Sequence, residues 1–177
     1  MSGESNNGKL SELYELIQDI EMAMFTTRRP DGHLVSRPMS TQKPAPDADL
    51  WFVTDINAHK VDEIESEPQV NVAYYNSGTR EFVSVSGRVR ISTDRARIRA
   101  LYKPDWKIWF ADEGGDRDGG PDDPRLALLF VTVESAVYGK KTKSRAGAIV
   151  EIAKSYVTGD EPDLMRVERV EGGGTSR

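Results

Sequence analysis

The stretch LWFVTDINAHKVDEIESEPQV, residues 50–70, contains the pattern of a strand, a loop and a helix in close succession. Its apolar start favours a buried strand. Val61 and Ile64 then recur at helical spacing, and the helix is expected to stop at the proline that follows. We therefore expect a helix from about Ala58 to Glu65, with Asn57 as its N-cap.

The loop and the first turn of this helix carry Thr54, His59 and Lys60. Free backbone N–H groups and the helix dipole already make this position electropositive, so added cations are unfavourable there unless an anion binds. Arg37, in the segment SRPMS at 36–40, adds a planar guanidinium suited to phosphate. The combination indicates a phosphate site. The simpler alternative is that these cations lie at the surface without a partner.

Composition narrows the classes of protein that fit. A chain of 177 residues suits one domain, and its net charge of −5 argues against a general nucleic-acid or membrane-surface binder. The chain has no cysteine and only two histidines, which argues against disulfides and against Cys-based or His-rich metal sites. With no apolar membrane span and no apolar signal core, we expect a cytoplasmic protein. The acidic loop 112–123 lacks the spacing of an EF-hand, so we expect a solvated loop and no metal.

Alternating or continuous apolar patterns predict six strands. These strands lie at residues 21–29, 33–42, 50–54, 69–76, 81–91 and 125–139. Pro38 cannot donate a ladder hydrogen bond, so its strand is expected to be an edge strand or to be bulged. Further helices are expected at residues 9–19, 93–102, 105–111 and 144–156. Thr93 is the expected N-cap of the helix at 93–102.

Six strands in antiparallel hairpins, with helices inserted at the connections, indicate a mainly β fold. Closure into a small barrel would remove the exposed edges, and an open α+β sheet is the alternative on pattern alone. We divide the chain into a disordered start at 1–8, a barrel domain at 9–140, and a C-terminal helix with a partly loose tail at 141–177.

The segments SRPMSTQ, LWFVTDINAHKVDEIESEPQVNVAYYN and FVSVSGRVRI, taken in this order, resemble the pyridoxamine 5′-phosphate oxidase-like flavin-binding split barrels. The later segment LYKPDWKIWFADEGG, followed by DDPRLALLFVTVESAVYG, is similar to the general stress protein branch of that family. The resemblance covers about residues 10–140 and implies a six-stranded antiparallel split β-barrel that binds FMN. It also implies a homodimer whose flavin site lies between the two subunits.

The resemblance further implies roles for particular residues. The FMN phosphate would be held by Arg37, His59 and Lys60, with Thr54 nearby. Contacts along the isoalloxazine, including a hydrogen bond from Gln42 to its pyrimidine side, would come from Pro38, Met39, Ser40, Gln42 and Val53. Contacts from the partner chain, or closure of the pocket, would come from Phe82, Trp109 and Tyr138. Helical spacing alone favours a core or dimer role for Trp106 and Trp109.

The implied function is that of an FMN-binding general stress protein with flavin-dependent redox activity, without an identified catalytic residue. Oxidases of the family carry a bulky aromatic residue where this chain has Gly139. A glycine cannot pack over a substrate ring, so the pocket is expected to be open there, or filled by Tyr138 or Trp109. We therefore expect pyridoxamine 5′-phosphate to be oxidised very slowly or not at all. Two alternatives stay open: a non-enzymatic flavin-binding or sequestering protein, and a deazaflavin-dependent reductase.

Overall fold

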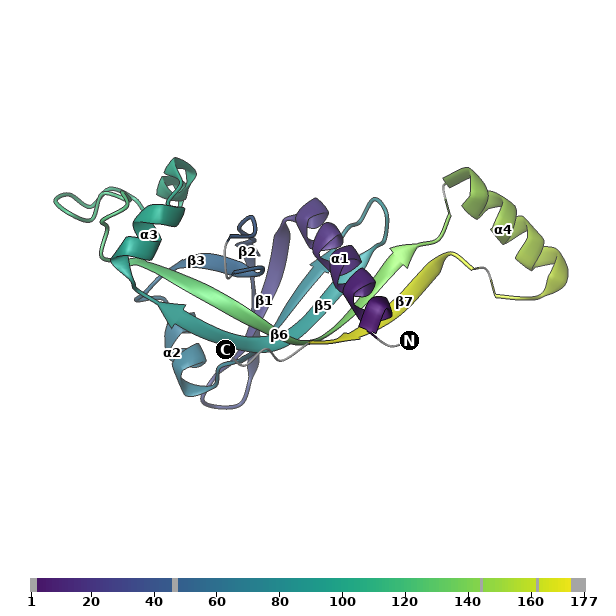
Figure 1. Cartoon of the computed structure of the whole chain (residues 1–177), viewed down its shortest axis with the longest axis horizontal. Coiled ribbons are helices and arrows are strands. Elements are labelled where there is room, and N and C mark those ends of the chain that lie inside the picture. Colours follow the sequence, from purple (N-terminus) through teal and green to yellow (C-terminus); the bar gives the residue numbers. More distant parts are fainter. Residues whose placement is uncertain (1–2, 46–47, 144, 162, 173–177) are drawn as a thin grey trace.

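The computed structural model describes residues 3–45, 48–143, 145–161 and 163–172, and its architecture is mainly β (Figure 1). Its strands are β1 (Met22–Arg28), β2 (Leu34–Ser40), β3 (Trp51–Asp55), β4 (Gln69–Tyr75), β5 (Phe82–Ser92), β6 (Leu126–Lys141) and β7 (Met165–Glu171). Its helices are α1 (Gly3–Ile20), α2 (His59–Ser66), α3 (Arg95–Leu101), the 3₁₀ helix η1 (Pro104–Ile108) and α4 (Arg145–Thr158).

The strands form one antiparallel sheet in the order β2-β1-β4-β5-β6-β3, and β7 pairs with β6 off this path. Strands β2 and β3 lie at the two ends of this path. In the described residues they do not pair with each other, so the sheet is not closed. The predicted antiparallel split-barrel fold is confirmed, whereas full closure of the barrel is not. Pro38 lies in edge strand β2 opposite Met24, which confirms its predicted edge position.

Strand β7 is the seventh strand, formed by a segment expected to be loose. Strand β6 is 16 residues long and continues past the end of its pairing with β5, at Gly139, to Lys141. This long strand offers β7 a free edge, and Val170 of β7 is buried opposite Ala136. Four of the seven residues of β7 are charged, and two of these are adjacent, so the sequence lacks the apolar alternation of a strand here.

Helix α1 packs its apolar side against the sheet. Leu13, Leu16 and Ile17 are buried and join Phe25 and Val72 of the sheet in the larger of two core clusters. The hydrophobic effect of removing these side chains from water holds α1 against the sheet. The helix begins at Gly3, so the structure is helical over residues 3–8 where disorder was expected. Residues 1–2 lie outside the described ranges.

A second, smaller cluster lies under α3 and η1. It combines Trp51 of β3, Ile98 of α3, Trp106 of η1 and Phe130 of β6. Trp51 and Trp106 meet edge to face with ring centroids 6.1 Å apart. This cluster fixes the η1 segment beside β3, which is where the candidate site is built.

Two predicted helix caps are wrong by one residue. The N-cap of α2 is Ala58, without a side-chain hydrogen bond, because the backbone and side-chain N–H groups of Asn57 both donate to Asp55 in the preceding turn. The N-cap of α3 is Asp94 rather than Thr93, and its carboxylate accepts two backbone N–H groups of the first turn. Both helices keep the positions that the apolar spacing predicts.

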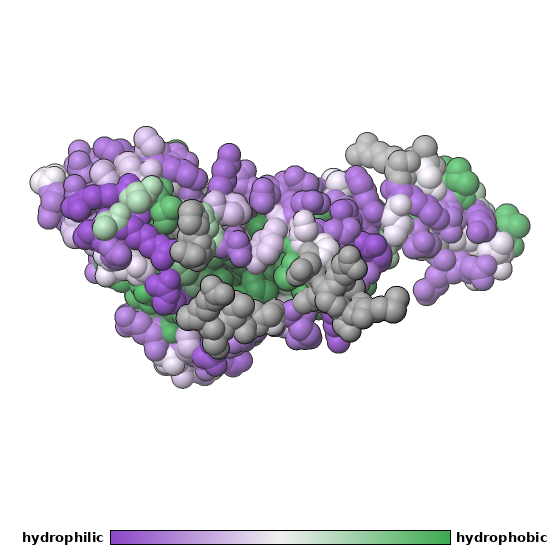
Figure 2. All heavy atoms as spheres, in the orientation of Figure 1, coloured by the Kyte–Doolittle hydropathy of each residue, from purple (hydrophilic) through white to green (hydrophobic). Residues whose placement is uncertain are grey.

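Helix α4 stands at the tip of the β6–β7 hairpin, away from the rest of the sheet (Figure 1). The predicted start of this helix, Ser144, lies outside the described residues. Its large exposed apolar side chains are Ile149, Val150, Ile152, Tyr156 and Val157. Figure 2 shows hydrophobic side chains on the surface of this projecting lobe. In the described part of the chain, no helix is both long and apolar enough to cross a membrane.

Candidate functional site

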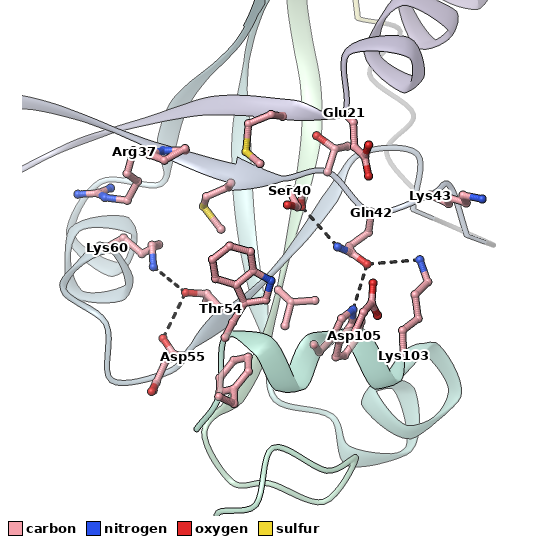
Figure 3. A pocket seen from close by; sticks show the side chains of 18 residues that line it. Glu21, Arg37, Ser40, Gln42, Lys43, Thr54, Asp55, Lys60, Lys103 and Asp105 are labelled. Atoms are coloured by element: carbon pink, nitrogen blue, oxygen red, sulfur yellow. Dashed lines mark hydrogen bonds between the residues drawn. The ribbon is translucent and has the colours of Figure 1, made fainter. Parts of the chain in front are cut away.

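A cavity of about 770 Å³ lies where β2, β3, the start of α2 and the η1 segment meet (Figure 3). Such a volume suits a small organic ligand or cofactor. The sequence-predicted residues that line it are Arg37, Pro38, Met39, Ser40, Gln42, Val53, Thr54, Lys60 and Trp109. The other lining residues are Glu21, Met22, Thr41, Lys43, Asp55, Lys103, Asp105, Trp106 and Phe110. His59 is not among them and is exposed at the first position of α2.

Both ends of the cavity carry cations, and only at the Arg37 and Lys60 end do they outnumber the acidic lining residues. Figure 3 shows Arg37 and Lys60 on one side of the cavity and Gln42 and Lys103 on the other, with Thr54 in between. Strand β2 supplies Arg37, β3 supplies Thr54, and α2 supplies Lys60. The edge strand β2, the end of β3 and the start of α2 therefore bring these three side chains to the same end of the cavity. The sequence predicts this grouping from the strand, loop and helix pattern.

Arg37 is held by two polar partners behind the cavity wall. Its Nη1 donates to Thr27 Oγ1 at 2.6 Å, and its Nη2 donates to Glu63 Oε2 at 2.9 Å. The Thr27 hydroxyl in turn donates to the same Glu63 oxygen. Burial acts to raise the pKa of Glu63, but the hydrogen bonds from Thr27 and Arg37 hold that pKa below its usual value. The carboxylate is therefore ionised at neutral pH.

Lys60 is bound in a different way. Its Nζ donates to the neutral hydroxyl of Thr54 at 2.9 Å, and its side chain is half-buried. Burial, followed by the positive charge of Arg37, lowers the pKa of Lys60, while Asp55 and Glu63 partly oppose that shift. A cation whose pKa is lowered in this way gains electrostatic stabilisation when an anion binds beside it.

The opposite end is built around the amide of Gln42. Its Oε1 accepts hydrogen bonds from Trp106 Nε1 at 3.1 Å and from Lys103 Nζ at 3.4 Å (Figure 3). An indole N–H and an ammonium group are donors only, so they fix the amide with its oxygen toward them. The Gln42 nitrogen lies 3.4 Å from the Ser40 carbonyl oxygen, a long contact that leaves it able to donate to a ligand.

The two tryptophans near the cavity have different environments. Trp106 is buried, and its ring meets Trp51 and Tyr102 edge to face. Trp109, one residue past the end of η1, is 71% exposed at the edge of the cavity. The helix expected at residues 105–111 is a short 3₁₀ helix that begins at Pro104 and ends at Ile108. Of the core or dimer role predicted for both tryptophans, Trp106 has the core role, whereas Trp109 is exposed and a dimer role for it stays a prediction.

Glu63 and Thr27 are not among the site residues predicted from the sequence, although their spacing carries a signal for both. Glu63 lies three residues after Lys60, a spacing that places both side chains on one side of a helix. In the β1–β2 hairpin Arg37 pairs with Phe25, so Thr27 lies two residues along on the same face. Neither spacing says which polar side chain is buried, and that burial is what distinguishes these two residues.

A family model described as pyridoxamine 5′-phosphate oxidase like matches residues 8–163. The chain belongs to this family. Protein bli-3 of Neurospora crassa is 33% identical over 165 residues, which cover 92% of this chain and 79% of that protein.

Solved structures agree with this assignment. A putative general stress protein 26 from Jannaschia sp. CCS1 has a TM-score of 0.72 and 25% identity, over 93% of this chain and 99% of that one. The general stress FMN/FAD binding protein of Xanthomonas citri has a TM-score of 0.55 and 27% identity, over 71% of this chain and 87% of that one. The predicted resemblance to the general stress protein branch of the pyridoxamine 5′-phosphate oxidase-like family is confirmed.

Two residues expected to reach a flavin from the partner chain have other surroundings. Tyr138 is fully buried, and its hydroxyl donates to Glu12 at 2.9 Å. Phe82 packs on Gly139, where a Cβ atom would lie 2.5 Å from Phe82 Cε1 and 2.7 Å from Met165 Sδ. The space expected to be open at Gly139, or filled by Tyr138 or Trp109, is therefore filled by Phe82 and Met165. Neither Tyr138 nor Phe82 lines the cavity.

Proposed function

We propose that this member of the pyridoxamine 5′-phosphate oxidase-like family binds FMN in the cavity and acts as a flavin-dependent redox protein. The observation that carries the proposal is the polarity of the cavity. Arg37 and Lys60 form a cationic end, while Met39, Val53 and Phe110 contribute apolar surface to the wall. At the other end Lys43 and Lys103 are matched by Glu21 and Asp105. An elongated ligand with a phosphate at the Arg37 and Lys60 end, an apolar ring body and a polar far edge fits this lining.

The donor set at the cationic end fits a phosphate monoester. A guanidinium has five N–H donors, and the bonds to Thr27 and Glu63 use two of those on Arg37. The remaining donors, together with the Lys60 ammonium group, would bind phosphate oxygens with charge-assisted hydrogen bonds. The lowered pKa of Lys60 supports the same assignment. Burial and the nearby charge of Arg37 make the ammonium group unfavourable, and a bound anion would offset that electrostatic cost.

The ring end fits the edge of an isoalloxazine. The Gln42 amide nitrogen has a second N–H, besides the one directed at Ser40, that would donate to a carbonyl oxygen of the ring, and Pro38, Met39 and Val53 provide apolar contact. FMN, when bound, supplies hydride or electron transfer, and the chain supplies binding, orientation and electrostatics. The exposed indole of Trp109 at the cavity edge is placed to cover a bound ring.

We further propose that two copies form a homodimer with the flavin site at their interface. Met22 and Trp109 both line the cavity and are 46% and 71% exposed, so apolar surface continues from the cavity onto the outside of the molecule. A second copy in an isologous contact would cover this surface on both chains. The exposed apolar side chains of α4 provide further surface for such a contact.

The experiment that tests the function combines identification of the ligand with turnover. We expect the purified protein to be yellow, and the chromophore released by denaturation to be FMN rather than FAD. We also expect the FMN-loaded protein to accept electrons from NADH or NADPH faster than free FMN does. Binding of FMN without any such turnover would favour the non-enzymatic flavin-binding alternative. Absence of flavin binding would contradict the proposal.

A further inference from the structure

The buried side chains behind Arg37 form a three-residue hydrogen-bond network that crosses three elements. Thr27 on β1, Arg37 on β2 and Glu63 on α2 are linked to one another by hydrogen bonds. Thr27 is fully buried, and the side chain of Glu63 is 9% exposed. Arg37 is the member of this network that lines the cavity. We call these residues the Arg37 network.

Two opposing effects of Glu63 can be separated on physical grounds. Its negative charge lies close to Arg37 and therefore opposes a bound phosphate through Coulomb repulsion. Its fixed carboxylate also holds one nitrogen of the guanidinium fork, and an arginine held in one orientation loses less side-chain entropy when it binds an anion. The first effect would weaken phosphate binding and the second would strengthen it.

The geometry favours the second effect. Thr27 and Glu63 hold adjacent nitrogens of one planar group, at 2.6 and 2.9 Å, so the guanidinium is restrained in both direction and rotation. The repulsion between Glu63 and a bound phosphate is partly offset by Lys60, which supplies a second positive charge at the same end of the cavity. The hydrogen-bond partner of Lys60 is the neutral hydroxyl of Thr54, so among the described residues its charge is not used by an ion pair. We propose that Glu63 and Thr27 are positioning residues that orient Arg37 for recognition of the ligand's phosphate. This inference rests on the proposed FMN function.

The test compares FMN with riboflavin, because the two ligands differ by the phosphate. We expect Glu63→Ala to weaken FMN binding about ten-fold, or roughly 1.4 kcal/mol, and to leave riboflavin binding unchanged. Glu63→Gln should restore most of the FMN affinity, since its amide oxygen still accepts from Arg37 and Thr27. Thr27→Val is close to isosteric and removes the hydroxyl, so it should weaken FMN binding selectively as well.

The matched control is Glu65→Gln, which removes the same charge from an exposed position on the same helix. It should change neither affinity. A general effect of helix charge would instead appear equally in this control. Thermal unfolding of each variant shows whether it folds, and if Glu63→Ala does not, Glu63→Gln and Thr27→Val still decide the question.

A double-mutant cycle with Arg37→Ala shows whether Glu63 acts through Arg37. In the Arg37→Ala background, Glu63→Ala should have no further effect on FMN affinity. Tighter FMN binding by Glu63→Ala, or an equal loss in the Arg37→Ala background, would overturn the positioning role and leave the FMN function standing. Equal affinity of the wild-type protein for FMN and riboflavin would remove the proposed phosphate site itself, and the inference with it.

Discussion

Lys60 illustrates how a single side chain can be unfavourable for folding and favourable for binding. Its ammonium group is half-buried near Arg37, and its pKa is lowered from the ordinary lysine value of 10.5. Below the lowered pKa the free protein bears the full cost of a desolvated charge. That cost disappears as pH rises toward 10.5, where the lysine of the unfolded chain also loses its proton. A bound phosphate offsets the same cost at neutral pH.

We therefore predict opposite effects of Lys60→Met on stability and binding. At pH 7 the ligand-free variant should unfold at a higher temperature than the wild type, because the charge is gone and the apolar stem remains. FMN binding should weaken about ten-fold to a hundred-fold, with riboflavin much less affected. Differential scanning fluorimetry and fluorescence titration measure the two effects. A ligand-free variant less stable than the wild type would contradict this account of Lys60.

Gly139 leads to a prediction about whether the protein oxidises pyridoxamine 5′-phosphate. Phe82 and Met165 occupy the space that a larger side chain would need, so the aromatic residue of the oxidases has no room here. We predict that FMN-loaded protein oxidises pyridoxamine 5′-phosphate very slowly or not at all, compared with free FMN under air. Product formation at about 1 per second or faster would restore an oxidase assignment.

At the scale of elements, the loop between η1 and β6 is organised around one buried ion pair. Asp123 is fully buried and accepts hydrogen bonds from the side chain of Arg125 at 2.7 and 3.0 Å, and from the backbone of Gly119 at 2.8 Å. Arg125 also donates to the carbonyl oxygen of Ala111 at 2.9 Å. The acidic composition of the loop predicts a solvated segment, but its end is fixed by this internal network.

We predict that Asp123→Ala lowers the midpoint of thermal unfolding by several degrees, because Arg125 would stay buried without its closest partner. The pH dependence has a defined sign. Hydrogen bonds from Arg125 hold the pKa of Asp123 far below its ordinary value of 3.8. Its stabilising contribution is therefore complete above pH 3.8 and is lost as pH falls below that value. Wild-type protein should lose stability in this acid range, and Asp123→Asn should lose less. Equal acid sensitivity would contradict this role.

How well the sequence predicts each element depends on where the controlling interaction lies. The two hairpins and α2 are predictable because alternation and helical spacing are local properties of the chain. Strand β7 is not predictable in this way, since it depends on the free edge of β6 about 30 residues earlier in the sequence. Barrel closure likewise depends on whether β2 meets β3. At the site, Arg37 and Lys60 follow from charge beside a helix start, whereas Glu63 depends on burial that only the packed chain reveals.

The whole molecule leaves apolar surface uncovered at several separate places. Met24 on β1, Leu34 on β2, Trp109 at the cavity and Tyr156 on α4 are 45%, 64%, 71% and 92% exposed. Among these places, α4 carries several large exposed apolar side chains on one short helix, and such a cluster is typical of an interaction site. A second copy of the chain would cover it and would place the cavity beside the interface, as proposed above.

We predict a dimer in solution. Light scattering at micromolar concentration should give about twice the chain mass of 19.7 kDa. The double change Ile149→Ser and Tyr156→Ser, on the exposed side of α4, should weaken the dimer. Lys154→Ser on the same helix serves as a control. A clean monomer that still binds FMN tightly would contradict a site shared between two chains.

Recognition of the phosphate is measured most directly by the difference in affinity between FMN and riboflavin for the wild-type protein. Charge-assisted hydrogen bonds from Arg37 and Lys60 should each contribute roughly 1.5–3 kcal/mol to binding of the phosphate. Fluorescence titration at low ionic strength should therefore show FMN bound at least about a hundred-fold more tightly than riboflavin. Arg37→Ala and Lys60→Ala should each remove part of this difference. Equal affinity for FMN and riboflavin, unchanged in both variants, would contradict the claim that this cavity recognises a flavin through its phosphate.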